Sequence, residues 1–217
     1  MGRPAKRRPV KPTVILDPGS CHDGSLSKAT ELIHIASGCG ADAIKFQLLS
    51  PAEEVGGNIG MDWDWLPKLM VIGECLGIEV FASVFDVKGI EWVTECGCKS
   101  IKFAYSQQAL YCDQMRMKFD TTYISCDVMN LHVNTDHVHL YCIPLYPVPY
   151  IVDFAGLFPR FEGFSDHTLN YGQTLKAVRA GAMVIEKHIQ GDWDSPTPDA
   201  RFALRPRELR QLMRKIK

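Results

Sequence analysis

The sequence contains no long apolar run of the kind that spans a membrane. Its 217 residues are 46% apolar and 23% charged, which is typical of a soluble globular protein, and no segment approaches the roughly 18 consecutive apolar residues of a transmembrane helix. A secretory signal is also lacking, because no apolar stretch follows the basic N-terminus. We therefore expect a cytoplasmic protein without a membrane partner.

Closely spaced cysteines are almost absent too. The eight cysteines are scattered, no Cys-x-x-Cys motif occurs, and only Cys96 and Cys98 lie near each other. This spacing favours neither a structural zinc site nor a disulfide framework. Most of the cysteines are therefore expected to act as small apolar residues in a reducing compartment.

Residues 1–12 form a basic segment without an apolar pattern, and we predict a flexible N-terminal arm there. The arm holds five positive charges among three prolines, and removing these charges from the net charge of −1 leaves −6 for residues 13–217. That balance argues against a specific nucleic-acid surface on the body, although the arm can contact a polyanion or act as a solubilising tail. Residues 13–217 suffice for one well-packed domain and are few for two.

Strand-like and helix-like segments alternate through this domain. We predict strands at residues 13–17, 41–47, 78–84, 99–104, 121–126, 137–143, 161–165 and 182–188. Helical patterns occupy residues 26–37, 65–76, 87–96, 107–118, 152–158, 169–180 and 207–216, and no convincing helix follows the fifth strand. Eight parallel strands with crossover helices favour a compact α/β TIM (β/α)8 barrel with a reduced fifth helix over an open doubly wound sheet.

Polar residues gather where these strands end, which is where such a barrel carries its chemistry. In chain order they are Asp17 and His22, Lys45 and Gln47, Ser83 and Asp86, Lys102, Ser125 and Asp127, Tyr146, His167 and His188. The two lysines interrupt apolar runs, AIKF and SIKF, and each can either reach solvent or face a pocket. On one rim with two histidines, they suggest a pocket for a small phosphorylated or carboxylated substrate.

His167 and His188 each close a strand-like run, and a predicted helix separates the two runs. Neighbouring parallel strands would therefore bring both histidines to one end of the sheet. Neutral imidazoles are common ligands of divalent metals, so this pair, flanked by Asp166 and Glu186, can form half of a metal site. A structural role for both histidines remains an equal alternative.

Nine motifs also follow one another in an order that one enzyme family shows. They are DPGSCHDG (17–24), GADAIKFQ (40–47), SVFD (83–86), KFA (102–104), YPVP (146–149), GFSDHT (163–168), GAMVIEKH (181–188), PD (198–199) and LRPREL (204–209). Over nearly the whole body, the chain resembles the barrel domain of the sialic acid (N-acetylneuraminate) synthases. These enzymes condense phosphoenolpyruvate with an N-acetylated sugar aldehyde such as N-acetylmannosamine.

The resemblance implies a metal-dependent, aldol-type transferase that makes a nonulosonic acid in carbohydrate biosynthesis and releases phosphate. It implies that His167 and His188 ligate a divalent metal, typically Mn²⁺, with Mg²⁺ or Co²⁺ as alternatives. The resemblance also matches four residues to positions that bind phosphoenolpyruvate, namely Lys45, Lys102, Ser83 and Ser165, with Gln47 and Tyr146 beside them. Asp17 matches a catalytic carboxylate, and Asp199 matches a residue that faces the sugar.

Several positions depart from the family pattern. Asp17 stands where the family has glutamate, Tyr105 where it has serine, and Pro144 where it has asparagine. Ser106 can replace the missing serine after a shift of one residue, so it joins the substrate-binding candidates. Two other functions therefore stay open: a metal-dependent lyase or phosphatase acting on a small phosphorylated acid, and a non-catalytic binding protein derived from the family.

The pocket also needs a cover, because a reaction that forms an oxocarbenium benefits from limited access of solvent. The sequence ends at Lys217, soon after the predicted barrel, so we expect the family's C-terminal antifreeze-like domain to be lacking. We predict that a homodimer or a separate capping protein covers the pocket. Residues 50–64 and 191–202 are candidate covering loops.

Overall fold

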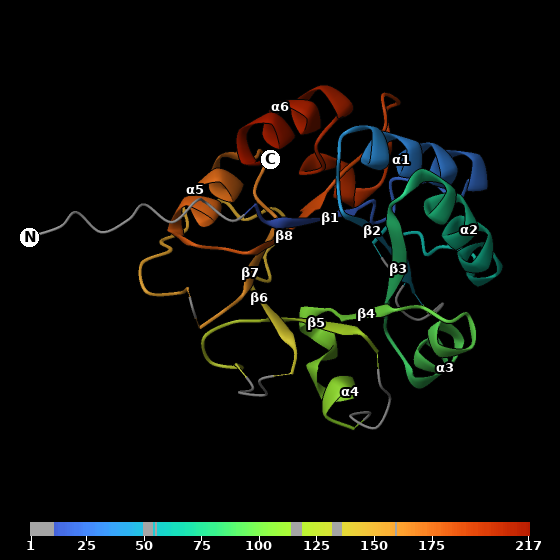
Figure 1. Cartoon of the computed structure of the whole chain (residues 1–217), viewed down its shortest axis with the longest axis horizontal. Coiled ribbons are helices and arrows are strands. Elements are labelled where there is room, and N and C mark those ends of the chain that lie inside the picture. Colours follow the sequence, from blue (N-terminus) through green and yellow to red (C-terminus); the bar gives the residue numbers. More distant parts are fainter. Residues whose placement is uncertain (1–10, 50–53, 55, 114–118, 132–135, 159) are drawn as a thin grey trace, which may run out of the picture.

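Eight parallel strands close into one barrel in the computed structural model, which describes all residues except 1–10, 50–53, 55, 114–118, 132–135 and 159. The strands are β1 (Thr13–Asp17), β2 (Ala43–Leu48), β3 (Glu79–Val84), β4 (Ser100–Phe103), β5 (Thr121–Cys126), β6 (Val138–Cys142), β7 (Gly163–Asp166) and β8 (Val184–His188). Each strand pairs with the next, and β8 closes on β1 with Thr13 opposite Val184 and Asp17 opposite His188. The predicted α/β TIM-barrel fold is confirmed (Figure 1).

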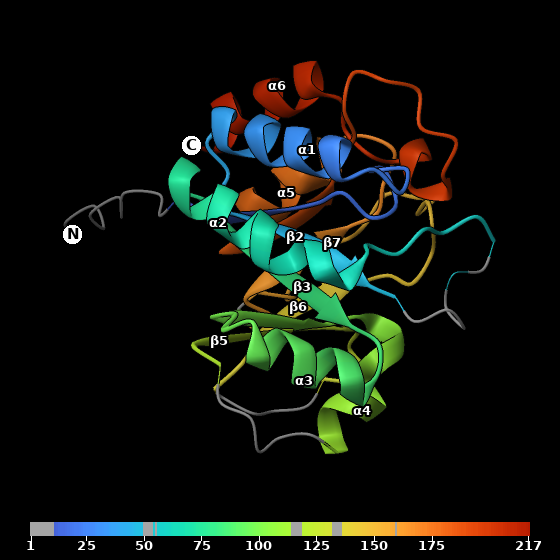
Figure 2. The same cartoon turned by 90° about the vertical axis from the view of Figure 1, so that its right-hand side faces the viewer.

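Helices surround this barrel on its outside (Figures 1 and 2). They are α1 (Leu26–Gly38), α2 (Leu66–Leu76), α3 (Val87–Glu95), α4 (Gln108–Asp113), α5 (Gly172–Ala180) and α6 (Pro206–Ile216). Three short 3-10 helices, which the sequence patterns did not predict, are η1 (Trp63–Trp65), η2 (Tyr105–Gln107) and η3 (Pro198–Arg201). Within the described residues, no helix is long and apolar enough to cross a membrane.

Individual residues explain where α3 begins and where α2 ends. Asp86, one of the polar residues after a predicted strand, caps α3 by accepting a hydrogen bond from the Gly89 amide at 2.7 Å. Gly77 ends α2 in the left-handed conformation, with φ of 68°. Asp86 therefore starts a helix, and it does not line the cavity described below.

Two predictions about the connections have different outcomes. The described part of the link between β5 and β6 contains no helix, as expected, while residues 132–135 lie outside the described part. The helix predicted at 152–158 is wrong, because residues 151–154 are irregular and turns follow. Val152 and Phe154 alternate with exposed residues and are buried against Phe161 and Phe164, so the segment packs as an extended chain. The end of the predicted helix 107–118 and most of the arm also lie outside the described residues.

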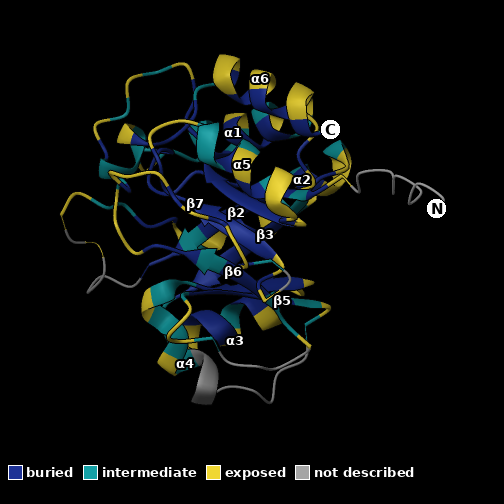
Figure 3. Ribbon diagram, turned by 90° about the vertical axis from the view of Figure 1, so that its left-hand side faces the viewer, coloured by how far each residue is buried: buried dark blue, intermediate teal, exposed yellow. Residues whose placement is uncertain are grey.

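The barrel interior is layered, because successive residues of a strand point to opposite faces. One buried apolar layer comprises Ile15, Ala43, Phe81, Tyr123, Leu140 and Val184. Two residues further along β1, β2 and β8 stand Asp17, Lys45 and Glu186, which line a cavity. Figure 3 shows the buried strands and the exposed outer faces of the helices. The apolar layer thus fills the barrel beneath a polar one.

Candidate active site

A cavity of about 430 Å³ opens at the carboxyl ends of the strands, where the barrel fold is expected to carry its chemistry. Ten of the eleven site residues predicted from the sequence line it: Asp17, Lys45, Gln47, Lys102, Ser106, Tyr146, Ser165, His167, His188 and Asp199. Ser83, the eleventh, is fully buried beside the cavity, and its hydroxyl donates to the Phe46 carbonyl at 3.3 Å. The structure therefore brings these residues together, while their roles stay predictions.

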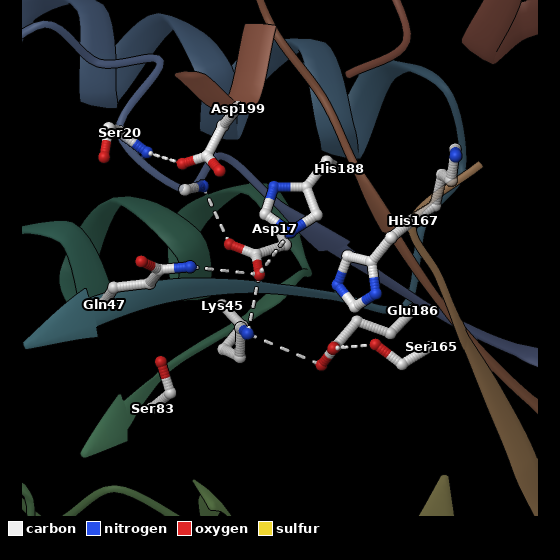
Figure 4. A network of polar contacts seen from close by, with 12 residues as sticks. Asp17, Ser20, Lys45, Gln47, Ser83, Ser165, His167, Glu186, His188 and Asp199 are labelled. Atoms are coloured by element: carbon white, nitrogen blue, oxygen red, sulfur yellow. Dashed lines mark hydrogen bonds and ion pairs between the residues drawn. The ribbon is translucent and has the colours of Figure 1, made fainter. Parts of the chain in front are cut away.

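Four buried acidic and basic side chains alternate across the floor of this cavity. Figure 4 shows Asp17, Lys45 and Glu186 among them. Lys45 Nζ lies 2.6 Å from Asp17 Oδ2 and 3.5 Å from Glu186 Oε2. Lys102 Nζ lies 2.9 and 3.0 Å from the two carboxylate oxygens of Glu186. The Ser165 hydroxyl donates to Glu186 Oε1 at 2.7 Å. Glu186 therefore joins both lysines.

These contacts decide the charge states. Burial by itself raises the pKa of Glu186, but the charges of Lys102 and Lys45 outweigh it and hold that pKa well below its usual range. For Asp17, burial is likewise outweighed by His188 and Lys45, so its pKa is lowered. Burial lowers the pKa of Lys45, but Asp17 and Glu186 reverse this and raise it. Both carboxylates and Lys45 are therefore charged at neutral pH.

Glu186 is a cavity residue that the sequence analysis mentioned only as a neighbour of the histidine pair. The sequence spacing could have identified Glu186 as a cavity residue. Glu186 precedes His188 by two residues on one strand, so the two side chains must lie on the same face of that strand. Asp166, by contrast, was expected near the histidine pair but does not line the cavity. It is one residue from both Ser165 and His167, so it faces outward, where it accepts hydrogen bonds from Thr168 and Thr174. Asp166 therefore does not line the cavity with the two histidines, and the metal site itself stays a prediction.

His167 and His188 lie next to each other in the cavity lining, with ring centroids 5.4 Å apart. Tyr146 packs on His167 at 4.4 Å between ring centroids, and His188 Nε2 lies 3.4 Å from Asp17 Oδ2. Burial lowers the pKa of His167 well below its ordinary value, which leaves the imidazole neutral and able to ligate. Among the described residues, the buried Nδ1 of His188 has no hydrogen-bond partner.

The described part of the chain contains no group of three or more His, Cys, Asp or Glu side chains placed to hold a metal ion. The candidate metal site therefore rests on the two histidines. A site with few protein ligands leaves positions for water or substrate, as catalytic metal sites require.

The turn after β1 brings Asp199 close to the histidine pair. The Ser20 amide donates to Asp199 Oδ2 at 2.8 Å, and the Gly19 amide donates to Asp17 Oδ1 at 2.8 Å. Gly19 has φ of +52°, and a Cβ atom there would lie 2.2 Å from Asp199 Oδ2 and 3.0 Å from His188 Nδ1. Only glycine therefore fits where the backbone passes these two side chains. The sequence analysis did not identify this requirement.

His22 is close to the site in sequence but lies outside the cavity lining. It is fully buried, its ring meets Trp65 edge-on at 6.0 Å between centroids, and its Nδ1 accepts from the Gly24 amide at 3.1 Å. Burial lowers its pKa from 6.5 to about 4, against the opposing effect of nearby carboxylates. His22 is thus a structural residue that stays neutral.

Acid is expected to destabilise the fold partly through His22. Between pH 6.5 and pH 4 the unfolded chain binds a proton at this residue and the folded chain does not, so stability falls as the pH falls, by about 3 kcal/mol at most. Urea unfolding at pH 7 and pH 4.5 measures this loss, which His22→Gln should reduce. The same substitution at His34, exposed on α1, is the control and should leave the loss unchanged. An equal loss in both variants would contradict the prediction.

The predicted covering loops both border the cavity. Asn58 lines it from the first loop, and Pro198, Asp199 and Arg201 line it from the second. Trp193 is half-buried and donates through Nε1 to the Cys21 carbonyl at 3.1 Å, so it holds its loop against the β1 turn. The predicted homodimer or capping protein stays a prediction.

Comparisons with known proteins agree with this fold and with the family resemblance. Residues 117–217 match the model of the NeuB family. An N,N'-diacetyllegionaminic acid synthase of Legionella pneumophila is 26% identical, with 100% of this chain and 76% of the relative covered. A human N-acetylneuraminate-9-phosphate synthase is 25% identical, with 94% and 69% covered. The crystal structure of N-acetylneuraminic acid synthetase from Leptospira borgpetersenii shares the fold, with a TM-score of 0.81, 23% identity and 95% and 82% of the two chains covered. Residues 117–217 therefore match the NeuB family, and nearly the whole chain is similar to proteins that are named as sugar-acid synthases.

Proposed function

We propose that this chain condenses phosphoenolpyruvate with an N-acetylated sugar aldehyde to form a nonulosonic acid and phosphate. The observation that carries the proposal is the cavity itself, which joins two buried lysines, two buried carboxylates and two histidines at the carboxyl ends of the strands. Its volume of about 430 Å³ lies within the range of small-molecule sites. The names of the NeuB relatives, which are sugar-acid synthases, support the same class of product.

Lys45 and Lys102 would hold the anionic oxygens of phosphoenolpyruvate. An ammonium group has three N–H donors, and the contacts to Asp17 and Glu186 leave each lysine with at least one for a substrate. The carboxylates also hold the ammonium groups in place before the substrate arrives, so less reorganisation is needed on binding. Glu186 is therefore a positioning residue for both lysines in this proposal.

His167 and His188 would hold a divalent metal, for which Mn²⁺ is our candidate. The fit rests on two imidazoles lining one cavity, on the low pKa of His167, and on the His188 Nδ1 that lacks a partner among the described residues. A bound divalent metal supplies Lewis acidity that polarises a carbonyl oxygen.

Asp17 and Asp199 would orient hydroxyl groups or water beside the reacting carbon. Asp17 Oδ2 contacts Lys45, and Gln47 Nε2 donates to the same oxygen at 3.4 Å, so the carboxylate has a defined direction. One oxygen of Asp199 accepts from Ser20, and the carboxylate lines the cavity, where it can accept from a sugar hydroxyl.

Release of inorganic phosphate from phosphoenolpyruvate tests the proposal. The protein is assayed with Mn²⁺, with and without N-acetylmannosamine. Release that needs the sugar supports the synthase. Release without the sugar indicates a phosphatase, and no release under either condition indicates a binding protein.

Both histidines are expected to contribute to binding of Mn²⁺. Single His167→Ala and His188→Ala substitutions should each weaken binding at least 10-fold, because a site with two protein ligands loses half of them. Electron paramagnetic resonance of free Mn²⁺ gives the affinity without a need for turnover. His139→Ala is the matched control, since His139 is a buried histidine on β6 outside the cavity. Unchanged affinity in both site variants would show that the histidines do not bind the metal.

A further inference from the structure

Helices α5 and α6 carry a concentration of positive charge that the average for the domain hides. The two helices lie next to each other on the outside of the barrel (Figure 1). They hold six basic residues and one acidic residue, a net charge of +5, whereas residues 13–217 together have −6. The remainder of residues 13–217 therefore has a net charge of −11. The basic residues of the two helices are Lys176, Arg179, Arg207, Arg210, Arg214 and Lys215.

These six residues are all exposed, and none of them forms an ion pair with another described residue. Glu208, the acidic residue of the two helices, accepts a hydrogen bond from the Arg205 amide at 3.0 Å and so caps the start of α6. The Tyr171 hydroxyl donates to Gln211 Oε1 at 2.9 Å, which joins the start of α5 to the middle of α6. The two helices therefore present one basic face, and its charge is mostly unmatched.

Three arginines form a stripe along α6. Arg207, Arg210 and Arg214 follow one another at spacings of three and four residues, so they lie on one side of the helix over about 10 Å. A cation in the last turn, such as Arg214, stabilises a helix through its dipole, but Arg207 stands in the first turn, where a cation opposes the dipole. Helix stability therefore does not explain the whole stripe.

The basic N-terminal arm joins the domain beside this face. The Val14 amide donates to Asp42 Oδ2 at 2.7 Å, and the ammonium group of Lys217, the residue after α6, contacts the same oxygen. The start of β1 thus lies beside the end of α6. Residues 1–12, of which 1–10 lie outside the described part, hold five further positive charges. The arm and the two helices therefore concentrate positive charge at neighbouring places.

We propose that α5 and α6, together with the arm, bind the phosphate backbone of a nucleic acid. Four of the six basic residues on the helices are arginines, whose planar groups match pairs of phosphate oxygens. None of the exposed large hydrophobic residues in the described part of the chain lies on α5 or α6, which argues against insertion into lipid and against an apolar protein interface. Backbone contacts carry no sequence information, so the binding is non-specific.

This surface is separate from the strand-end cavity, because no residue of α5 or α6 lines that cavity. The inference therefore does not depend on the proposed reaction. It also locates positive charge that the net charge of residues 13–217 conceals, since an average over the domain says nothing about where the charges lie.

Fluorescence anisotropy of a labelled single-stranded DNA of about 20 nucleotides, titrated with the full chain, tests the proposal. The dissociation constant should be on the order of 10 µM near physiological salt, and the logarithm of affinity should fall linearly with the logarithm of salt concentration. The triple variant Arg207→Gln, Arg210→Gln and Arg214→Gln should weaken binding at least 10-fold. It should also reduce the salt slope by about 2, because each phosphate contact on a single strand contributes about 0.7.

A second triple variant, Lys68→Gln, Lys88→Gln and Lys99→Gln, is the matched control. These lysines are exposed on α2, on α3 and just before β4, so the variant has the same net charge as the arginine variant but keeps the basic face intact. Its affinity should change less than about 3-fold, because screening limits the effect of distant charges. Circular dichroism melting shows whether both variants remain folded. Equal losses of affinity in the two folded variants would overturn the proposal.

Two other results would also overturn it. Neutralising Lys6, Arg7 and Arg8 of the arm should weaken binding only in part. If this change abolishes binding while the arginine variant binds normally, the arm acts alone and the helices have no part. Vesicles containing phosphatidylserine are the second comparison, and tighter binding to them than to the DNA would assign the basic face to a lipid surface.

Discussion

Replacing Lys102 by methionine is expected to remove turnover and to destabilise the barrel. Lys102 is 1% exposed, and its loss leaves the buried Glu186 carboxylate with Ser165 and with Lys45 at 3.5 Å. Breaking a buried ion pair by removing one partner costs about 3–5 kcal/mol. Turnover should fall on the order of 100-fold or more, the size seen when a preorganised donor is removed from a reacting group.

The double variant Lys102→Met with Glu186→Gln separates these two effects. Neutralising the carboxylate removes the unpaired buried charge, so the urea midpoint should return toward that of the unchanged protein while turnover stays lost. Unfolding curves and phosphate release are measured on the same preparations. Recovery of both stability and turnover would show that Lys102 serves only the fold.

Lys187→Met is the matched control for this pair of variants. Lys187 is a buried lysine on β8 whose Nζ lies 3.5 Å from Asp166 Oδ1, on the outer side of the barrel. Its replacement should also lower stability, but turnover below the melting temperature should remain near that of the unchanged protein. A loss of turnover equal to that of Lys102→Met would mean that destabilisation alone explains the first result.

Replacing Gly19 by alanine is expected to damage the site more than the fold. The new Cβ would lie 2.2 Å from Asp199 Oδ2 and 2.7 Å from its Cγ, so the Asp199 side chain must move. The positive φ of 52° adds about 1–2 kcal/mol of backbone strain. Because Asp199 faces the proposed sugar site, we expect KM for the acceptor to rise and turnover to fall about 100-fold, since small displacements of positioning groups carry costs of this order.

Gly40→Ala provides the comparison for backbone strain alone. Gly40 has φ of +80° and no atom within 4 Å of a built Cβ, so its replacement should lower stability by a similar amount and leave acceptor KM unchanged. Steady-state kinetics and urea unfolding distinguish the two variants. Equal kinetics for Gly19→Ala and Gly40→Ala would contradict a steric role for Gly19.

The regular part of the fold follows from local sequence patterns. The strand at Thr13–Asp17 has its predicted bounds, because a β-branched apolar run ends at Asp-Pro-Gly. Predicting a helix at 152–158 failed, since the apolar residues there fit an extended buried chain as well as a short helix. Short apolar segments do not distinguish these alternatives by spacing alone.

Strand periodicity by itself determined which residues share a face, as with Ser165 and His167, or Glu186 and His188. It also placed most of the site residues at one end of the predicted barrel. Only closure of the barrel decided which charges meet, since Lys102 and Glu186 lie 84 positions apart. The turn that brings Gly19 under Asp199 likewise joins distant parts of the chain. Such pairings depend on register and close packing across the tertiary structure, and neither leaves a signal in the spacing of residues along a single strand.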